Sequence, residues 1–517
     1  MKRVQQPPRQ PVVDEGSRQA LGSIGLLLGS ASGRAGQIAA HAILARALGV
    51  EAFGLYVLGW TIVQLSQSAG HLGLCDGVVR FLSRHRGTDH GQVKDLLTRA
   101  LGLSLLMGLL LGSVAWFGAG DLAGALFGKP DFGGVLRAFA PAIVVAPLLI
   151  VAVGATRATS QMRHSILAFD AGLPLMILIV VSVLAFHGTR TTGMALATSA
   201  AFLVATGVAL SQVGWLYRTE IRASRCPRQE REPLVRFSLA ALSMSISMLL
   251  LLWSDRLFIG AFRPAAEVGA YHAASQLSVV TVVVYQPLAA VLAPLVAGAA
   301  WRTNAAALRV GYQNVCRWGL YLVAPLLVLA FVLAAPILGW IYGAQFSVSA
   351  PAARLLIVGQ TSWLVGGVVG TVLVMTGHQR LWLWCSTLAV LANLGLNGLL
   401  VPTYGMLGAA AATAVCQIGL YGGGCLLVRL RLGVWPLARG TLVAVLASGL
   451  TVALGLSLSN LLGDGNIWMM AGVACAAIGV LYAVIVATGT YCADTSILQY
   501  LRELRLRGFA GRTGGAA

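Results

Sequence analysis

The chain has 517 residues, of which 57% are hydrophobic and only 10% are charged, and its mean hydropathy is +0.81. Soluble domains average roughly 25% charged residues, so the composition excludes a protein whose surface faces water over most of its length. The formal net charge of +19 would suit nucleic acid, but its placement, described below, favours a membrane. The eight cysteines are scattered singly and predict neither a zinc site nor a disulfide framework.

Apolar stretches follow one another along the whole chain. A membrane helix needs about 20 apolar residues, and we count fourteen such stretches. They lie at residues 20–46, 54–78, 95–119, 134–156, 163–186, 192–216, 237–262, 268–299, 311–341, 351–375, 381–402, 406–428, 438–461 and 466–490. The polar segment before the first stretch lacks the apolar core and cleavage site of a signal peptide, so we expect that stretch to be retained.

These stretches predict an all-α polytopic membrane protein with about 14 transmembrane helices, arranged as two six-helix lobes and two C-terminal helices. The predicted parts are a cytoplasmic N-terminal tail (1–19), an N-lobe (20–217), a basic cytoplasmic linker (218–236), a C-lobe (237–430), two further helices (431–490) and a cytoplasmic amphipathic tail (491–517).

Cationic residues are concentrated in every second loop. With the N-terminus in the cytoplasm, the cytoplasmic loops carry clusters such as Arg80, Arg84 and Arg86, whereas the outer loops carry few cations, among them Lys129 and Arg190. Cytoplasmic loops of membrane proteins are enriched in Lys and Arg, so we expect an even number of spans with both termini cytoplasmic in a bacterial plasma (inner) membrane. Topology and contacts with membrane lipids then explain the charge, and no nucleic acid partner is expected.

The chain resembles itself at an offset of about 215 residues. Gly54-Leu55-Tyr56 recurs as Gly269-Ala270-Tyr271, and Leu126-Phe127-Gly128 recurs as Ile341-Tyr342-Gly343. Looser matches follow in the same order, with Thr192-Gly193-Met194 recurring as Tyr404-Gly405-Met406. Six helices per repeat give both copies the same orientation, which predicts a pseudo-twofold axis along the membrane normal and a substrate site between the halves.

The first two predicted spans carry polar stripes. Arg34 lies about a dozen uncharged residues from either end of its span, roughly 18 Å, which is too far for its side chain to reach the interface. One helix face holds Arg34, Gln37 and His41, and the second span repeats this spacing in Gln64, Gln67 and His71. Two interpretations stay open, namely a wet substrate cavity lined by these residues and a structural hydrogen-bond network between helices.

Further polar residues lie deeper in the chain. Asp255-Arg256 falls in the seventh span, where Arg256 is the counterpart of His41 in the repeat. Arg256 could extend to the outer interface or bind substrate, and Asp255 could neutralise Arg34 across the pseudo-twofold axis. Asp170 is a lone acid that suits either a proton carrier or a structural role. Weaker candidates are the stripe Ser275, Ser278, Thr281 and Tyr285 and the interhelical pair Asn393 and Asn397.

Motifs of enzymes are missing from the sequence. Gly128-Lys129 is followed by Pro130, so it is no Walker A loop, and neither HExxH nor GxSxG occurs. The chain also offers no large extramembrane segment for catalysis. We therefore expect no enzyme, no metal and no cofactor, although a coupling ion, H+ or Na+, would suit a carrier.

Several segments resemble the polysaccharide biosynthesis (O-antigen flippase) family of the multidrug/oligosaccharidyl-lipid/polysaccharide (MOP) superfamily. They are Arg46-Ala47-Leu48-Gly49-Val50-Glu51-Ala52-Phe53-Gly54-Leu55-Tyr56, Ser254-Asp255-Arg256-Leu257-Phe258-Ile259-Gly260, Val268-Gly269-Ala270-Tyr271, Gly377-His378-Gln379-Arg380 and Val401-Pro402-Thr403-Tyr404-Gly405-Met406-Leu407-Gly408-Ala409-Ala410. The resemblance implies alternating access between two six-helix lobes and movement of an undecaprenyl-pyrophosphate-linked oligosaccharide to the outer leaflet. It also implies that a cavity cation holds the pyrophosphate, a role that Arg34 fits and Arg256 fits less well.

The leading hypothesis is a flippase that supplies lipid-linked oligosaccharide for surface polysaccharides such as O-antigen, lipopolysaccharide or exopolysaccharide. In this hypothesis Arg34 holds the pyrophosphate, the Gln and His stripes bind sugars, and the polysaccharide polymerase machinery is a partner. The alternative is a drug/cation antiporter of the multidrug branch, for which Asp170 or Asp255 would be the ion-exchanging acid. A membrane-bound sugar polymerase or ligase is the third class.

Overall fold

The computed structural model describes residues 12–159, 162–224, 234–279, 305–366 and 369–435, and a few short stretches and single residues between 445 and 479. Side chains are described from Gly29 onward. The predicted fourteenth span and the two tails fall mostly or wholly outside these residues, as do most of the predicted eighth and thirteenth spans and the middle of the basic linker. Thr281 and Tyr285 of the predicted polar stripe also lie outside them.

Helices make up the architecture. The helices from the N-terminus to residue 262 are α1 (Val12–Gly70), α2 (Leu74–His85), α3 (His90–Phe117), α4 (Ala119–Asp121), the π-helix η1 (Leu122–Leu126), α5 (Phe132–Arg157), α6 (Met162–Ser165), the π-helix η2 (Ile166–Asp170), α7 (Gly172–Phe186), α8 (Thr191–Leu216), α9 (Arg218–Ile221) and α10 (Leu234–Phe262). Residues 265–279 are also helical. The helices that follow are α13 (Ala305–Val332), α14 (Ala334–Tyr342), the 3-10 helix η4 (Ala344–Ser349), α15 (Ala350–Gly366), α16 (Val369–Met375) and α17 (Gln379–Leu432).

Seven helical segments within the described residues are long and apolar enough to cross a membrane, and an eighth is gained if the broken pair α13 and α14 counts as one span. This confirms an all-helical, multi-pass membrane protein. Two of the segments are much longer than a bilayer requires, because 54 helical residues in α17 would extend about 80 Å at 1.5 Å per residue, against a hydrocarbon core of roughly 30 Å.

Each of the two longest helices is broken at one glycine. Gly49 in α1 has φ 76° and ψ 172°, and Gly405 in α17 has φ 56° and ψ −134°. Residues with a Cβ rarely adopt such positive φ values, so glycine makes a sharp turn possible with no intervening loop. The first and second predicted spans thus share α1, and the eleventh and twelfth share α17.

Two predicted spans are less regular than the sequence suggested. The fifth is not one helix but the succession α6, η2 and α7, in which the backbone widens into a π-helix between Ile166 and Asp170. The second ends earlier than residue 78, because Leu72 and Gly73 adopt positive φ after α1 ends. The chain then continues as α2, whose buried face alternates with a face bearing Arg80 and Arg84.

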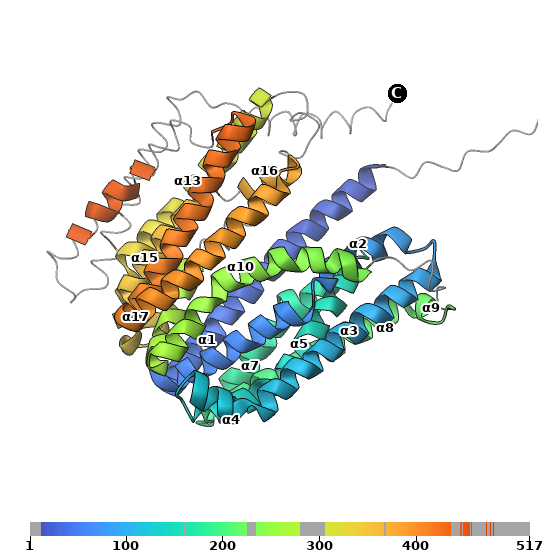
Figure 1. Cartoon of the computed structure of the whole chain (residues 1–517), viewed down its shortest axis with the longest axis horizontal. Helices are drawn as coiled ribbons and strands as arrows, with labels where there is room; N and C mark the ends of the chain where they lie inside the picture. The colour runs from blue at the N-terminus through green and yellow to red at the C-terminus, as the bar shows by residue number, and fades with distance from the viewer. Residues whose placement is uncertain are drawn as a thin grey trace, which may run out of the picture. The chain divides into compact units, whose positions relative to one another are not determined.

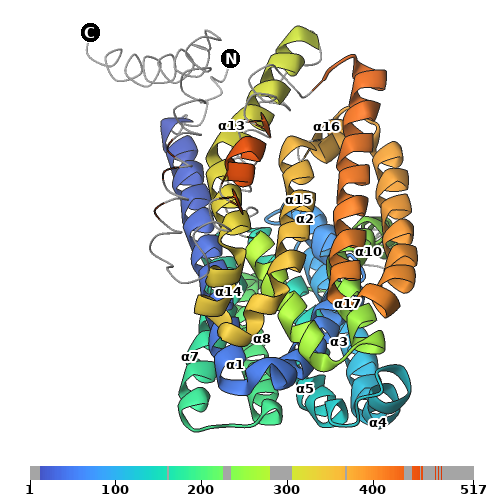
Figure 2. The same ribbon diagram turned by 90° about the vertical axis from the view of Figure 1, so that its left-hand side faces the viewer.

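The chain divides into two compact units. The first comprises Met1–Val283, Ala334–Gln360 and His378–Leu420, and the second comprises Val284–Leu333, Thr361–Gly377 and Tyr421–Ala517. Within the first unit α5 is central, because α3 and α8 pack against it and 78% of its apolar window is buried, against 28% for α3. Helix α1 packs along both α5 and α7 (Figures 1 and 2).

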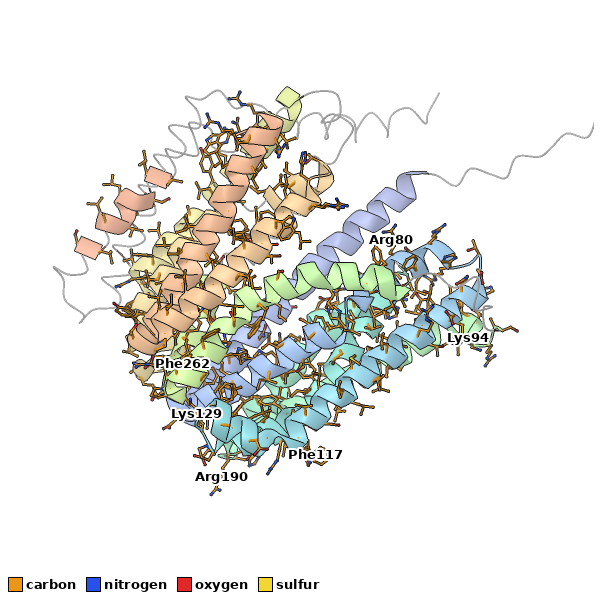
Figure 3. All side chains as sticks on the ribbon, in the orientation of Figure 1. Arg80, Lys94, Phe117, Lys129, Arg190 and Phe262 are labelled. Atoms are coloured by element: carbon orange, nitrogen blue, oxygen red, sulfur yellow. The ribbon has the colours of Figure 1, made fainter. Side chains whose placement is uncertain are left out.

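The first unit has two ends that differ in their labelled residues. Figure 3 shows Arg80 and Lys94 at one end of its helices, and Phe117, Lys129, Arg190 and Phe262 at the opposite end. We call these the Arg80 end and the Lys129 end. Their separation agrees with the alternation of cationic loops in the sequence, in which Arg80 and Lys94 are predicted to be cytoplasmic and Lys129 and Arg190 to be outside.

Candidate functional site

A buried polar cluster forms where the first half of α1 meets residues 265–279 and the end of α10. His41 of α1 places its Nδ1 atom 3.1 Å from Nε2 of His272 and 3.0 Å from the amide nitrogen of Gln276. His41 is 2% exposed and His272 is fully buried. Aromatic side chains from the second half of α1, Phe53 and Trp60, enclose the His41 ring on its other sides.

Arg256 extends this cluster toward α10. Its Nε donates to Nδ1 of His272 at 3.2 Å, its Nη2 donates to the hydroxyl of Ser275 at 2.6 Å, and its Nη1 donates to the carbonyl of Leu252 at 2.7 Å. The guanidinium also lies 4.6 Å from the ring centre of Trp253. Arg256 is therefore held inside the protein by directed contacts and does not extend to the interface, which was one of the two predicted possibilities.

Asp255 points into a second buried network on the other side of α10. Its Oδ2 accepts hydrogen bonds from the hydroxyls of Tyr271 (2.5 Å) and Thr413 (2.7 Å), and its Oδ1 accepts one from the amide of Asn397 (3.0 Å). Asn393 links Ser254 to Thr413 in the same network. These partners satisfy the carboxylate without Arg34, so the predicted pairing of Asp255 with Arg34 is not formed.

Arg34 and Gln37 lie on the same helix as His41 but outside the cluster. Glycines on the neighbouring face bring α1 close to the α6–α7 region, since a Cβ on Gly33 would lie 1.8 Å from the carbonyl oxygen of Asp170. Arg34 is exposed and Gln37 is half-buried. Because a cation exposed to lipid at this depth is costly, the position favours an aqueous surface beside Arg34.

The second predicted stripe is split by the structure. Gln64 is half-buried, and Gln67 is buried with no hydrogen-bond partner for its amide nitrogen among the described residues. His71 accepts a hydrogen bond at Nδ1 from the backbone N–H of Gly73 at 2.9 Å. His71 thus stabilises the turn between α1 and α2. Gln67 keeps a buried donor that a ligand or an ordered water would satisfy.

Asp170 is not a lone acid. Arg157, at the end of α5, donates to both of its carboxylate oxygens at 2.9 and 3.2 Å, and Ser165 also hydrogen-bonds to it. In this ion pair a single nitrogen, Nη2 of Arg157, contacts both carboxylate oxygens, and the pair links the π-helix η2 to α5. The acid is therefore committed to an ion pair, which favours the structural interpretation that the sequence left open.

The Lys129 end of the first unit is closed by backbone contacts. Gly54 and Gly269, which correspond in the internal repeat, approach each other so closely that a Cβ on Gly54 would lie 1.8 Å from the carbonyl oxygen of Ala265. A Cβ on Gly269 would lie 2.6 Å from the carbonyl oxygen of Val50. The residues that repeat in the sequence are thus in contact in space, at the level of the turn at Gly49.

Two cations reinforce this closed end by binding carbonyl groups in the last turns of helices. Arg46 donates to the carbonyls of Trp340 and Ile341, the latter at 3.0 Å. Lys129 donates to the carbonyl of Gly260, in the last turn of α10, and to that of Phe127. Cations are favourable at the C-termini of helices, where carbonyl groups lack intrahelical partners.

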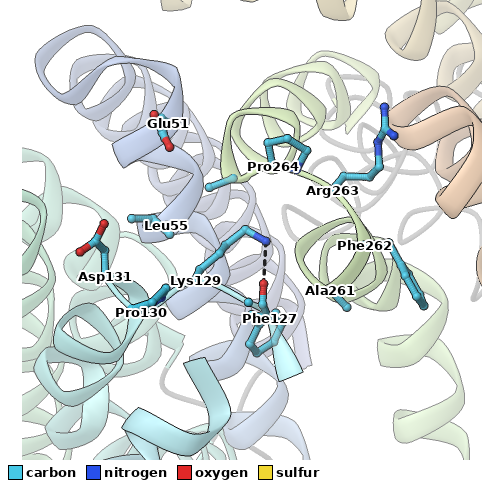
Figure 4. A pocket seen from close by; sticks show the side chains of 12 residues that line it. Glu51, Leu55, Phe127, Lys129, Pro130, Asp131, Ala261, Phe262, Arg263 and Pro264 are labelled. Carbon is cyan, nitrogen blue, oxygen red and sulfur yellow. Dashed lines mark hydrogen bonds between the residues drawn. The ribbon is translucent and has the colours of Figure 1, made fainter. Parts of the chain in front are cut away.

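A cavity of about 430 Å³ surrounds Lys129 at this end. Figure 4 shows Lys129 extending into it beneath Glu51 and Pro264, while the Arg263 side chain points away. Burial lowers the pKa of Lys129. Arg263 instead pairs with Glu267 at 2.9 Å, and Glu267 accepts a hydrogen bond from the backbone of Met406. The cavity is therefore a cleft between loops that are already bound to each other.

No three His, Cys, Asp or Glu side chains that could hold a metal ion gather among the described residues. The sequence missed His272, Gln276 and Arg157. His272, Ser275 and Gln276 lie at i, i+3 and i+4 and share one helix face. Ser275 begins the polar stripe predicted from the sequence, so extending this stripe by one turn toward the N-terminus would have indicated this face.

Residues 43–351 match the family described as polysaccharide biosynthesis protein. The chain belongs to this family. A probable low-salt glycan biosynthesis flippase, Agl15 of Haloferax volcanii, is 26% identical over 163 residues. That match covers 32% of this chain and 34% of Agl15, so the chain spans about a third of the length of this relative.

Solved structures show that this polysaccharide biosynthesis protein has the fold of the MOP superfamily. The lipid II flippase MurJ in an inward closed conformation has a TM-score of 0.68 at 13% identity, covering 90% of this chain and 99% of MurJ. An inward-facing multidrug resistance transporter of the MATE family has a TM-score of 0.59 at 17% identity, covering 79% of this chain and 94% of its own. These similar proteins are named as flippases or transporters, which fits a family of non-enzymes.

Proposed function

We propose that this member of the polysaccharide biosynthesis family is a flippase that moves a lipid-linked oligosaccharide, carried on undecaprenyl pyrophosphate, to the outer leaflet of a bacterial plasma membrane. It would have fourteen spans in two pseudo-symmetric six-helix lobes plus two helices, with both termini in the cytoplasm. The product would supply surface polysaccharide synthesis, and the polymerase machinery would be its partner. Membership of the polysaccharide biosynthesis family and the similarity to Agl15, a probable glycan biosynthesis flippase, support the assignment as a flippase.

The observation that carries the proposal is the exposed Arg34 in the middle of an apolar helix. The α1 helix continues without a break from Val12 to the turn at Gly49, so Arg34 lies fifteen residues, or about 22 Å, from that turn. A permanently charged guanidinium at this depth needs water or an anion. Gln37, one turn on, would add donors for a sugar or phosphate.

Substitution of Arg34 tests the proposal. Arg34→Ala should abolish export of the glycan while the protein stays in the membrane at its normal level, because the anionic group loses its counter-charge. Arg34→Lys should keep part of the activity, since the site needs charge more than a fork of donors. Arg190→Ala, an exposed cation at the Lys129 end, is the matched control and should export normally. Normal surface glycan in Arg34→Ala cells would rule out the role of Arg34.

The membrane potential would assist this movement, since an anion leaving a negative interior runs with the field. One charge gains about 2.3 kcal/mol per 100 mV, so a pyrophosphate diester with about two charges would gain roughly 4–5 kcal/mol on that scale. Liposomes with an imposed potassium diffusion potential and labelled lipid-linked oligosaccharide measure this. A flipping rate that ignores both the potential and every H+ or Na+ gradient would leave only facilitated exchange.

The drug/cation antiporter is the weaker alternative. It requires a cavity acid that is available for ion exchange, whereas Asp255 is fully hydrogen-bonded inside the protein and Asp170 is paired with Arg157. Cationic dyes offer the discriminating measurement. Proton-dependent dye efflux that survives Arg34→Ala would favour the antiporter over the flippase.

A further inference from the structure

The His41–His272 contact joins the two halves of the internal repeat. His41 belongs to the first repeat, whereas His272, Gln276 and Arg256 belong to the second, and all four lie within the first unit. The contact is sealed, because His41, His272 and Arg256 are each at most 6% exposed. The hydrogen atoms of this pair of imidazoles can be placed from the chemistry of its neighbours.

Arg256 fixes the protonation of His272. A guanidinium has only donors, so Nδ1 of His272, which receives the Arg256 Nε–H, must be an unprotonated acceptor. The ring proton of His272 is then on Nε2, and this atom faces Nδ1 of His41 at 3.1 Å. His272 is therefore neutral and donates to His41.

His41 is the common acceptor of this relay. Its Nδ1 receives the His272 Nε2–H, and the amide nitrogen of Gln276 also donates to it at 3.0 Å. The same amide nitrogen is farther from His272 Nε2, at 3.4 Å, which is consistent with His41 as its acceptor. His41 is therefore neutral as well, and the relay runs in one direction from Arg256 through His272 to His41.

A further proton on either imidazole breaks the relay. A proton on His41 Nδ1 would face two donors, His272 and Gln276, and a proton on His272 Nδ1 would face the Arg256 guanidinium. In both cases a hydrogen bond becomes a donor–donor contact next to a permanent cation, in a site that water does not reach. Among the described residues, the other ionisable groups around the pair are Tyr56, Tyr271 and Asp255, and the Asp255 carboxylate already accepts hydrogen bonds from Tyr271, Thr413 and Asn397.

The relay lies just below the closed Lys129 end. His41 is eight residues, or about 12 Å, before the turn at Gly49, and His272 is three residues, or about 4.5 Å, after Gly269, whose virtual Cβ contacts the carbonyl oxygen of Val50. Separation of the helices at that contact must also separate His41 from His272. The relay therefore stabilises the closed form of this end only while both rings are neutral.

We propose that His41 and His272 form a proton-binding site that latches the two repeats together at the Lys129 end when neutral and releases them when it takes up a proton. The open form binds the proton more tightly than the closed form, so acidification favours opening. If the Lys129 end faces outward, as the loop charges predict, the latch responds to external pH. Its use in transport rests on the flippase function proposed above, whereas the latch itself does not.

Distance measurements by pulsed electron resonance test the latch without any glycan. Spin labels at Asp131→Cys and Tyr404→Cys, exposed positions in the first and second repeats, are placed in a background from which the eight native cysteines have been removed. In liposomes the closed distance should dominate at pH 8. A longer distance should grow as the pH falls below about 6.5, by up to about tenfold in the open-to-closed ratio per pH unit for one proton.

Matched variants identify the groups that titrate. Glutamine keeps donors and acceptors but cannot be charged, so His41→Gln and His272→Gln should each weaken the pH response and the double variant should abolish it. His187→Gln, an exposed histidine between α7 and α8, should leave the response unchanged. Histidine-labelled ¹⁵N NMR of the otherwise unaltered protein, assigned with the single variants, should show both rings neutral with the proton on Nε2 at pH 8.

Three results would overturn the latch: a distance that ignores pH in the parent protein, a full response in the double variant, or a charged ring or an Nδ1–H tautomer in the closed form. These readouts also keep the two proposals apart. A pH response without glycan flipping would remove the flippase and leave the latch, and flipping without a pH response would do the reverse.

Discussion

The two copies of the internal repeat share a scaffold but differ in charge. In the first copy Tyr56 hydrogen-bonds directly to Thr198 at 2.8 Å. Tyr271, the counterpart of Tyr56 at the 215-residue offset, and Thr413 both donate to Asp255, which stands where the first copy has Ala40. A tyrosine–threonine contact is therefore a simple interhelical bond in one copy, and a tyrosine and a threonine form a carboxylate site in the other.

The difference between the two copies lies in their side chains and not in their backbone contacts. The backbone contacts of the repeat are kept, as the mutual approach of Gly54 and Gly269 shows. The chemistry differs at two successive positions, where Ala40-His41 in the first copy corresponds to Asp255-Arg256 in the second. The second copy supplies the fixed charges and the first supplies the neutral acceptor that they act upon.

The largest expected effect comes from removing the carboxylate that distinguishes the copies. Asp255→Ala removes the acceptor of the Tyr271 and Thr413 hydroxyls and leaves the Arg256 cation without its neighbouring anion, and loss of one partner of a buried charged group costs about 3–5 kcal/mol. The thermal unfolding of the purified protein should shift strongly downward. Ala40→Ser, at the corresponding position of the first copy, is the control. An unchanged Tm for Asp255→Ala would contradict the buried network.

A smaller effect is expected from the glycines that the copies share. Gly54→Ala places a methyl group 1.8 Å from a backbone oxygen, and Gly269→Ala places one at 2.6 Å. Overpacking of this kind costs roughly 1–3 kcal/mol, and Gly54→Ala should cost the more of the two. Gly214→Ala in α8, which has open space around it, should change the free energy of unfolding by less than about 1 kcal/mol. Equal stability of all three variants would mean that the Lys129 end is not closely packed.

The smallest expected effect is the difference in stability between variants of the two corresponding tyrosines. Tyr271→Phe removes a hydrogen bond to a carboxylate, worth about 1.5–3 kcal/mol, whereas Tyr56→Phe removes one to a hydroxyl, worth about 0.5–1.5 kcal/mol. The expected difference of about 1 kcal/mol is measurable by chemical or thermal denaturation of the two variants side by side. A greater loss for Tyr56→Phe would reverse the comparison and place the more demanding site in the first copy.

Periodic signals in the sequence predicted much of the fold. Apolar stretches of about 20 residues located the long helices α1, α3, α5, α8, α10, α13 and α17, and the repeat of Gly-x-Tyr located Gly54 and Gly269, which lie in contact. The break of the fifth span at η2 could not be predicted, because it depends on a pairing between Arg157 and Asp170 across two helices. A π-helix has no signature in apolar periodicity.

The site was only partly predictable for the same reason. His41 and Arg256 were singled out by their cost inside a membrane, and they meet through His272 in the structure. His272 lies four residues after the predicted start of its span at residue 268, next to Tyr271 and among small residues. A polar side chain so close to the end of a span costs little free energy, so the sequence did not single out His272. Whether an imidazole faces another imidazole or a cavity is decided by the rotation of whole helices, which a single sequence does not record.

The single-residue turn at Gly49 has a mechanical consequence. Helix continues on both sides of Gly49 with no loop between them, so a change in the backbone at this one residue reorients one arm of α1 relative to the other over its whole length. A displacement of His41, close to this turn, is therefore carried along the arms toward Arg34 on one and Gln67 on the other. Through this turn, the position of the imidazole pair is coupled to the positions along α1 at which a headgroup would be held.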